Sequence, residues 1–191
     1  MMGKQHIIFG TITGAGTYLL LNQIAPQFTE NTIWYFSGIL LGSLSPDIDT
    51  ETSTLGHLVS PIAKLINKLF GHRTITHDVL LWSIIAIISI LLKPITFGFW
   101  FGYLGHLFLD CFTVNGIMWG YFFHKKYTKS KHRDLMMFSH GFIHLLPYRF
   151  RMKSSGTAAK LFTYFIAIMF IYGIYLYSNY INVDIFTNII I

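Results

Sequence analysis

Long uncharged apolar runs are the feature that most restricts the fold of this chain. Residues 7–25 form a run of 19 residues without Asp, Glu, Lys or Arg, close to the roughly 20 residues that a membrane-spanning helix needs. Charged residues make up 12% of the 191 residues and hydrophobic residues 53%, whereas soluble domains are about one quarter charged. The sequence therefore predicts an integral membrane protein.

The apolar runs divide into four to five predicted transmembrane helices within one all-α, polytopic membrane helical bundle. The pair Lys93-Pro94 separates two of them, because proline cannot continue a helix. Residues 114–123 and 135–146 are apolar but interrupted, so we expect interfacial or re-entrant segments there. The predicted spans are residues 7–25, 31–44, 78–92, 95–112 and 158–177.

Glycines and the single cysteine add further restrictions. Gly10, Gly14 and Gly16 lie in the first span, where small residues let helices approach closely in lipid. Cys111 has no partner for an internal disulfide and excludes a cysteine-based zinc knuckle. The length predicts a single integral-membrane domain, residues 1–191, with a core over 1–123, a basic cytoplasmic segment over 124–157 and a last transmembrane helix over 158–178.

The positions of lysine and arginine predict the orientation. Nine of the 14 basic residues lie between 124 and 160, and Lys64, Lys68 and Arg73 lie in the loop that follows the second span. With the N-terminus and Lys4 on the cytoplasmic side, every basic residue except Lys93 falls there, as the positive-inside rule requires. The net charge of +6 is thus placed for a membrane surface rather than for nucleic acid.

This orientation brings histidine and aspartate to the cytoplasmic ends of four predicted helices. His106 and Asp110 are four residues apart and share a helix face. The acidic pair in the string SPDID follows the second span, and the string HRTITH precedes the third. The candidate residues are His6, Asp47, Asp49, His72, His77, His106 and Asp110.

Each of these residues has a structural alternative. A histidine at a helix end is often a surface or capping residue, and Asp47 and Asp49 could cap a helix through backbone N–H groups. His106 and Asp110 could simply bond each other. Ionisable residues within membrane spans are costly to bury, however, and the structural alternative would have to hold at four places independently. A functional site is therefore favoured.

Histidine and aspartate without cysteine indicate a divalent-metal site. Imidazole suits zinc, iron and nickel, and carboxylate adds affinity for magnesium and manganese; zinc is favoured, with manganese, iron or magnesium as alternatives. Seven ligands would suffice for two or more ions, and a bound ion makes water nucleophilic near neutral pH. Arg73 has the planar fork that suits phosphate, although it could equally be a positive-inside anchor.

These motifs resemble the YdjM-like family. An early His, PDID, HRTITH and GYLGHLFLD carry the resemblance, which covers residues 4 to about 123. It implies a LexA-regulated (SOS response) inner-membrane, metal-dependent hydrolase acting on phospholipid-like substrates, with the seven candidates as its metal-site residues. Asp78 and Gly105 stand where the family usually has serine, and Asp78 could alter the surroundings of the site.

The leading hypothesis is a multi-pass inner-membrane hydrolase that cleaves a phosphoester at the cytoplasmic leaflet. In this interpretation Asp49 is a base or bridging ligand, Arg73 steadies the phosphate, and the basic surface attracts anionic lipid headgroups. The alternatives are a metal-ion transporter or sensor and a non-catalytic protein with a structural metal site. A transporter needs polar residues that continue to the outer face, yet strings such as IIAIISILL are apolar.

The remaining histidines are weaker candidates. His57 lies in the inner loop, and His124 and His132 belong to the basic string HKKYTKSKH. His140 and His144 have a spacing compatible with a metal, but no acidic residue is close, so an interfacial helix face is favoured for them.

Overall fold

The computed structural model describes residues 3–124, 138–139, 142–153 and 155–180, and the predicted mainly helical class is confirmed. Five helices of the structure coincide with the predicted spans to within four residues at every end. The helices are α1 Gly3–Ile24, α2 Thr32–Leu44, α3 Thr54–Leu58, α4 Ser60–Phe70, α5 Val79–Leu92, α6 Phe97–Asp110, α7 Tyr121–His124 and α8 Thr157–Tyr180.

Two of these helices are long and apolar enough to cross a membrane, namely α1 and the part of α8 from Thr157–Tyr177. The helices α2, α5 and α6 have 13, 14 and 14 residues, so each is about 20 Å long, short of the ~30 Å hydrocarbon core. The predicted four to five transmembrane helices are therefore not confirmed. α5 is limited at its start by Asp78, which caps it, and at its end by Lys93 and the proline that follows.

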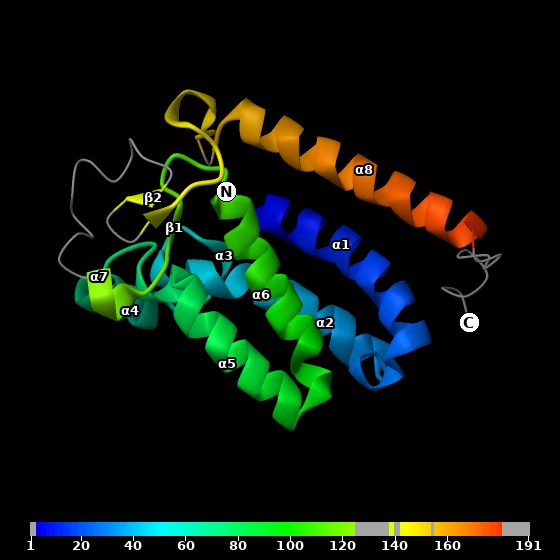
Figure 1. Ribbon diagram of the computed structural model, residues 1–191. Helices are drawn as coiled ribbons and strands as arrows, with labels where there is room; N and C mark the ends of the chain where they lie inside the picture. The colour runs from blue at the N-terminus through cyan, green and yellow to red at the C-terminus, as the bar shows by residue number, and fades with distance from the viewer. Residues whose placement is uncertain (1–2, 125–137, 140–141, 154, 181–191) are drawn as a thin grey trace.

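The helices α2 and α6 lie side by side, and glycines let their backbones touch. A Cβ atom on Gly42 would overlap the carbonyl oxygen of Phe99, and one on Gly98 would overlap that of Tyr35. No larger residue fits without moving one backbone away from the other. This close pairing, visible in Figure 1, fixes the relative height of the two helices and of the side chains at their ends.

The first helix packs against the same α2 through the glycines that the sequence singled out. A Cβ on Gly10 would overlap Ser43, and one on Gly14 would overlap the side chain of Ile39. Gly16 faces α8 instead, where a Cβ would lie 3.2 Å from Ile174. The predicted close approach is thus confirmed, and α1, α2 and α6 form the centre of the bundle.

Two segments that we expected to be interfacial or re-entrant contain short strands near the N-terminal end of α1. The described residues of 114–123 and 135–146 contribute a small antiparallel sheet in the order β1-β3-β2, and α7; their position relative to a membrane stays a prediction. Positive backbone φ angles at Gly116 (63°) and Gly120 (68°) turn the chain on both sides of β1 and keep it short. The strands are β1 Ile117–Met118, β2 Phe138–Ser139 and β3 Phe142–Ile143. Residues 125–137, 140–141 and 154 of the predicted basic segment lie outside the described residues.

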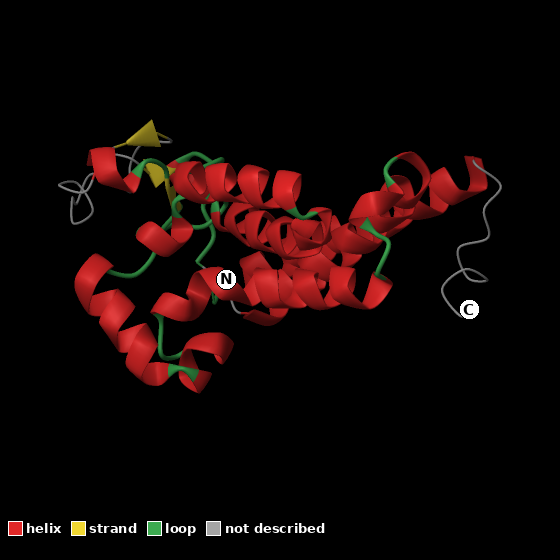
Figure 2. Cartoon of the chain, turned by 90° about the horizontal axis from the view of Figure 1, so that it is seen from below, coloured by secondary structure: helices red, strands yellow, loops and turns green. Residues whose placement is uncertain are grey.

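The inner loop after α2 is also more ordered than the sequence indicated, since it contains α3 and α4. α4 lies across the end of the bundle rather than along it (Figures 1 and 2). It exposes Ile62, Leu65 and Leu69, which recur at the three- and four-residue spacing of one helix face. Asn67 donates a hydrogen bond of 2.9 Å to the backbone oxygen of Asp49, so α4 supports the turn that follows α2.

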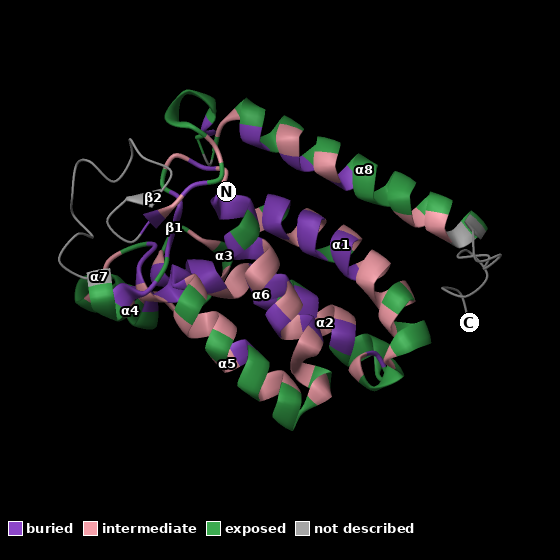
Figure 3. Cartoon of the chain, in the orientation of Figure 1, coloured by how far each residue is buried: buried purple, intermediate pink, exposed green. Residues whose placement is uncertain are grey.

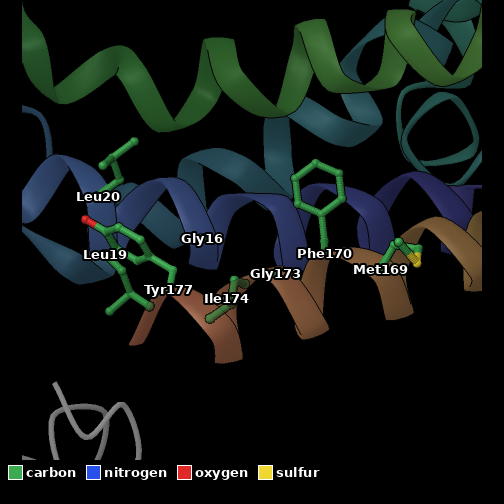
Figure 4. A pocket seen from close by; sticks show the side chains of 8 residues that line it. All are labelled: Gly16, Leu19, Leu20, Met169, Phe170, Gly173, Ile174 and Tyr177. Carbon is green, nitrogen blue, oxygen red and sulfur yellow. The ribbon is translucent and has the colours of Figure 1, made fainter. Parts of the chain in front are cut away.

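Burial differs between the two ends of the bundle. Buried residues gather inside α1, α2 and α6 and at the end that carries the sheet, whereas α8 is largely exposed (Figure 3). Towards the other end, an apolar groove of about 470 Å³ runs between α1 and α8, with Leu19 and Leu20 on one wall and Phe170 and Ile174 on the other (Figure 4). No histidine or acidic residue of the described chain lines this groove, so the candidate chemistry lies elsewhere.

Candidate metal centre

Four chain segments meet at the end of the bundle where α1 begins. They are the first turn of α1, the 3-10 turn η2 (Ser45–Asp49) after α2, the 3-10 turn η3 (Ile75–His77) before α5, and the end of α6. All five side chains that they bring together are buried, with at most 8% of the residue exposed. These residues, called the cluster below, are His6, Asp47, His77, His106 and Asp110.

Neighbouring donor atoms of the cluster are spaced like ligands of an ion, in two overlapping groups of three that share His106. His106 Nε2 lies 3.7 Å from Asp47 Oδ1 and 3.5 Å from Asp110 Oδ2. His77 Nε2 lies 3.6 and 3.5 Å from the same two oxygens, and His6 Nε2 lies 3.7 Å from Asp110 Oδ1. Two donors of a tetrahedral ion bound at about 2.1 Å are separated by about 3.4 Å. The observed separations are close to that value.

Four nitrogens of the cluster, Nδ1 of His6 among them, lack hydrogen-bond partners in the described part of the chain. The Nε2 atoms of His6, His77 and His106 are buried and have none within the described part of the chain, although nearly all buried polar groups are paired. His106 Nδ1 donates to the carbonyl oxygen of Ser43 at 2.7 Å, which leaves the lone pair on Nε2. The residues present therefore fit a divalent ion, which would satisfy these Nε2 atoms and the two carboxylates together.

Arg73 is buried beside the cluster and holds one of its carboxylates. Its Nη2 lies 2.8 Å from Asp110 Oδ2, and its Nη1 donates to Thr113 Oγ1 at 3.0 Å. The backbone φ of Arg73 is 58°, a left-handed value uncommon for a residue other than glycine. This conformation turns the backbone N–H towards Asp49 at 2.9 Å. The guanidinium is therefore committed to Asp110 and is not a surface anchor.

Two of the seven predicted ligands, Asp49 and His72, stand next to the cluster rather than in it. Asp49 Oδ1 lies 2.9 Å from His72 Nδ1, and its Oδ2 accepts a bond of 2.7 Å from the Thr76 hydroxyl. That hydroxyl also lies 3.0 Å from His77 Nδ1. Polar groups behind a ligating imidazole commonly fix its orientation. The ligand roles predicted from the sequence stay predictions; the structure brings five of the seven residues together.

Charges within the site shift the pKa values of the groups on the turns. Burial opposes ionisation of Asp47, but the imidazoles of His106 and His77 outweigh it and hold the pKa of Asp47 well below its usual range. Burial likewise opposes ionisation of Asp49, yet the hydrogen bond from His72 and the charge of His77 lower the pKa of Asp49.

His77 shifts in the other direction. Burial works to lower the pKa of His77, but the nearby carboxylates of Asp110 and Asp47, 3.5 and 3.6 Å from its Nε2, raise it above the ordinary 6.5. A proton on His77 thus serves the same carboxylates as a metal ion would, and the two compete.

Other polar residues flagged in the sequence serve the fold. Asp78 Oδ1 accepts bonds from the backbone N–H groups of Leu80, Leu81 and Gly120, so it caps α5 and ties it to the turn before α7. His144 is buried outside the cluster with Nε2 3.0 Å from the Val114 oxygen, and not on an interfacial helix. The exposed His57 lies on α3, whereas His132 and His140 lie outside the described residues.

Sequence reasoning missed the residues that orient the cluster. The Ser43 carbonyl, the Thr76 hydroxyl and the Tyr103 hydroxyl, which donates to the Thr76 carbonyl at 2.6 Å, have no motif of their own. Only the spacing within HRTITH placed Thr76 near the candidates. Backbone partners such as Ser43 depend on helix packing and leave no signal in a sequence.

A cavity of about 400 Å³ opens beside the cluster. Asp47, His72 and Arg73 line it. The side chain of Asp47 is 11% exposed, whereas those of the other four cluster residues are fully buried. Asp47 is therefore the point at which the cluster meets the cavity, and a small molecule in the cavity can approach the cluster from that side.

A helical bundle with two helices able to cross a membrane, and a buried cluster of three imidazoles and two carboxylates at one end, defines a membrane protein with a candidate metal centre. The family model described as YdjM inner membrane protein matches residues 1–181. The chain belongs to this family of inner membrane proteins, which confirms the resemblance seen in its motifs.

Curated relatives align with about three fifths of the chain. YvsG of Bacillus subtilis (strain 168), named an uncharacterized protein, is 34% identical over 122 residues, which is 61% of this chain and 71% of YvsG. The inner membrane protein YdjM of Escherichia coli (strain K12) is 27% identical over 129 residues, 61% of this chain and 63% of that protein, and the Shigella flexneri protein matches equally. No solved structure matches the chain.

Proposed function

We propose that this protein is a membrane-embedded, metal-dependent hydrolase that cleaves a phosphoester in a phospholipid-like substrate at the cytoplasmic leaflet. One observation carries the proposal: three buried Nε2 atoms without hydrogen-bond partners in the described chain converge with two carboxylates. This set borders a cavity that is open to small molecules. A purely structural role would require a closed ligand shell, whereas catalytic metal sites keep an accessible side.

In this proposal the five cluster residues hold the metal. A divalent ion bound there supplies Lewis-acid chemistry, polarising a phosphoryl oxygen and making water acidic enough to attack. Three imidazoles favour zinc or iron over magnesium, which prefers oxygen ligands. The five residues form two overlapping groups of three donors that share His106, so we expect one ion held by one group with help from the other. A second ion, as expected from the sequence, would need further ligands such as Asp49 and His72, and these two are already bonded to each other.

The residues around the cluster position it and exclude water. Arg73 holds Asp110 in place and partly neutralises it. The Ser43 carbonyl fixes the ring of His106, and the ring of His6 stacks on that of His106 with 3.5 Å between centroids. These contacts keep the donors near their bound positions, so little reorganisation is needed on metal binding.

His72 and Asp49 are placed to move a proton. His72 Nδ1 bonds Asp49, whose other oxygen is held by the Arg73 N–H and the Thr76 hydroxyl. This leaves Nε2 on the opposite side of the ring, and His72 lines the cavity. A histidine oriented by a buried carboxylate is a common general acid or base. We assign to His72 Nε2 the proton that the leaving oxygen needs when the phosphorus–oxygen bond breaks, with Asp49 orienting the ring.

The family and the charges support a proposal for the membrane arrangement. We propose that α1, α2, α5, α6 and α8 lie in the inner membrane as a multi-pass bundle, with the short helices extended at their ends by the adjoining turns. Exposed apolar side chains on α5, such as Ile84, Ile87 and Leu91, are suited to lipid contact. The positive-inside bias places the cluster at the cytoplasmic leaflet, where lysines and arginines attract anionic lipids.

The test is hydrolysis by the full chain purified in detergent. Vesicles of bacterial phospholipids and soluble phosphoesters are screened for phosphate or headgroup release, with protein stripped by chelator and then reloaded with zinc, manganese or iron. Activity should depend on the ion and be lost in His106→Gln, while His57→Gln, a matched change on the exposed face of α3, keeps it. Equal activity in stripped and loaded protein would refute the proposal; metal flux in proteoliposomes without hydrolysis would favour a transporter.

A further inference from the structure

The cavity beside the cluster has a polar wall to which neither the motifs nor the comparisons assign a role. Besides the residues already described, Lys4 of α1, Thr52 and Thr54 from the segment after η2, and Asn115 before β1 line it. They come from three separate parts of the chain. The volume of about 400 Å³ falls within the ~300–1,000 Å³ typical of small-molecule sites.

Some polar groups of this cavity are already committed to the fold. Thr50 bonds Asp49 and His72, and the Ser53 hydroxyl donates to the Asp47 carbonyl and accepts from the Gly56 N–H. These bonds shape the wall and leave little capacity for a ligand.

The other four wall residues are available. Among the residues that the structure describes, no hydrogen bond or ion pair engages the side chains of Lys4, Thr52, Thr54 or Asn115, and all four are exposed. One cation, two hydroxyls and one amide therefore face a cavity whose inner end is the cluster. A site that carries unpaired polar groups selects ligands able to pair with them, since a ligand lacking those groups leaves them unsatisfied.

The charges of the cavity favour an anion. Asp47 is the one carboxylate among its lining residues, and it faces the imidazoles of the cluster. Lys4 supplies a positive charge at the wall, and His72 also lines the cavity and offers a ring nitrogen. The hydroxyls and the amide carry no charge and suit the hydroxyl groups of a carrier such as glycerol or a sugar.

We propose that this cavity binds a phosphate ester of a hydroxylated carrier. Lys4 and His72 contact the phosphate, and Thr52, Thr54 and Asn115 hydrogen-bond to the hydroxyls of the carrier. The inference rests on the proposed function in one respect only, namely that the bound ester is also the substrate. The same chemistry occurs in the headgroup of phosphatidylglycerol and in soluble glycerol phosphate, so the experiment uses both.

Binding is measured on the full chain in detergent by calorimetry, with sn-glycerol 3-phosphate, inorganic phosphate and glycerol as probes. The wild type should bind glycerol phosphate at least tenfold more tightly than inorganic phosphate, and glycerol most weakly. Lys4→Met should weaken both anions about tenfold. Thr52→Val with Thr54→Val should reduce the affinity for glycerol phosphate to that for phosphate and leave phosphate binding unchanged. Lys93→Met, which removes a lysine at the opposite end of the bundle, is the matched control.

Co-sedimentation with phosphatidylglycerol vesicles, using protein in nanodiscs of a neutral lipid, identifies the source of the headgroup. If the protein binds the vesicles but not the soluble ester, and this binding depends on Lys4, the ligand is a lipid headgroup. If it binds the soluble ester in a Lys4-dependent way, the ligand is a soluble phosphate ester. Equal losses in Lys4→Met and Lys93→Met, equal affinity for ester and phosphate, or no binding of either probe would overturn the inference.

Metal content and hydrolysis are measured on the same preparations. Binding that depends on Lys4 without any hydrolysis would refute the proposed function and leave the binding site standing. Metal-dependent hydrolysis that is unchanged in Lys4→Met and in the double threonine variant would support the proposed function and refute the binding site.

Discussion

Replacing Asp110 with asparagine separates two contributions of this residue. The substitution keeps the size of the side chain but removes its charge. In the wild type the buried Arg73 guanidinium lies 2.8 Å from Asp110 Oδ2, and the substitution removes this anion. It also removes the carboxylate that faces the Nε2 atoms of His77 and His106 at 3.5 Å. The first loss destabilises the metal-free protein, whereas the second weakens metal binding and also removes the contact of His77 with Asp110 in the metal-free protein.

The magnitudes follow from the burial of both groups. Removing one partner of a buried ion pair costs about 3–5 kcal/mol, and each kcal/mol shifts Tm by about 2–4 °C in a chain of this size. Metal-free Asp110→Asn should therefore melt about 6–20 °C below the wild type. An ion at 100 times its Kd adds about 2.7 kcal/mol to the wild type, but a 100-fold weaker Kd leaves about 0.4 kcal/mol.

The assay is thermal unfolding of chelator-treated protein in detergent, with and without added zinc. A matched variant, Arg73→Met with Asp110→Asn, removes the Arg73 guanidinium as well. It should recover part of the metal-free Tm but none of the zinc-induced rise. An Asp110→Asn protein that melts like the wild type and gains as much from zinc would refute the reasoning about both contributions.

Three other predictions concern the packing, the protonation and the chemistry of the site. Gly42→Ala should lower Tm by several degrees, because the added Cβ overlaps the backbone of α6. Gly173→Ala is the control, since a Cβ there has no atom within 4 Å, and its Tm should not fall. Equal Tm values for the two variants would contradict the close pairing of α2 and α6. The pKa of His77 is raised, so its contribution to metal-free stability is complete below about pH 6.5 and is lost as pH rises through the folded pKa. The rise in Tm caused by zinc should instead grow as pH increases through this range. Tm measured against pH, with and without zinc, tests this. If both contributions changed with pH in the same direction, the proton on His77 and the metal ion would not share the carboxylates. His72→Gln should keep the metal and lose at least 100-fold in hydrolysis rate, and loss of metal would make His72 a ligand.

The positions of the helices could be predicted because hydropathy and proline act locally. Lys93 and the following proline end α5 as expected, and the glycines of α1 contact α2 as expected. The lengths needed for crossing a membrane could not be predicted, because Asp78 was counted in a span and the structure uses it as a cap. The small sheet was missed because its strands have two residues each, too short for any periodicity.

The candidate site was predictable to the level of which segments meet. Hydropathy and charge bias together placed His6, Asp47, His77 and the end of α6 at one level, and the structure brings them together. It could not distinguish Asp47 from Asp49, two residues apart in the same turn. A 3-10 turn points these side chains in different directions, one to the cluster and one to His72. That distinction depends on backbone geometry that the motif does not encode.

The most direct test of the account is the metal content of the full chain purified in detergent without chelator. We expect about one zinc-class ion per chain in the wild type and in His57→Gln, and almost none in Asp47→Asn combined with His77→Gln. Full metal content in that double variant, or a wild type that holds no ion after incubation with zinc, would contradict the central claim that the cluster is a metal centre.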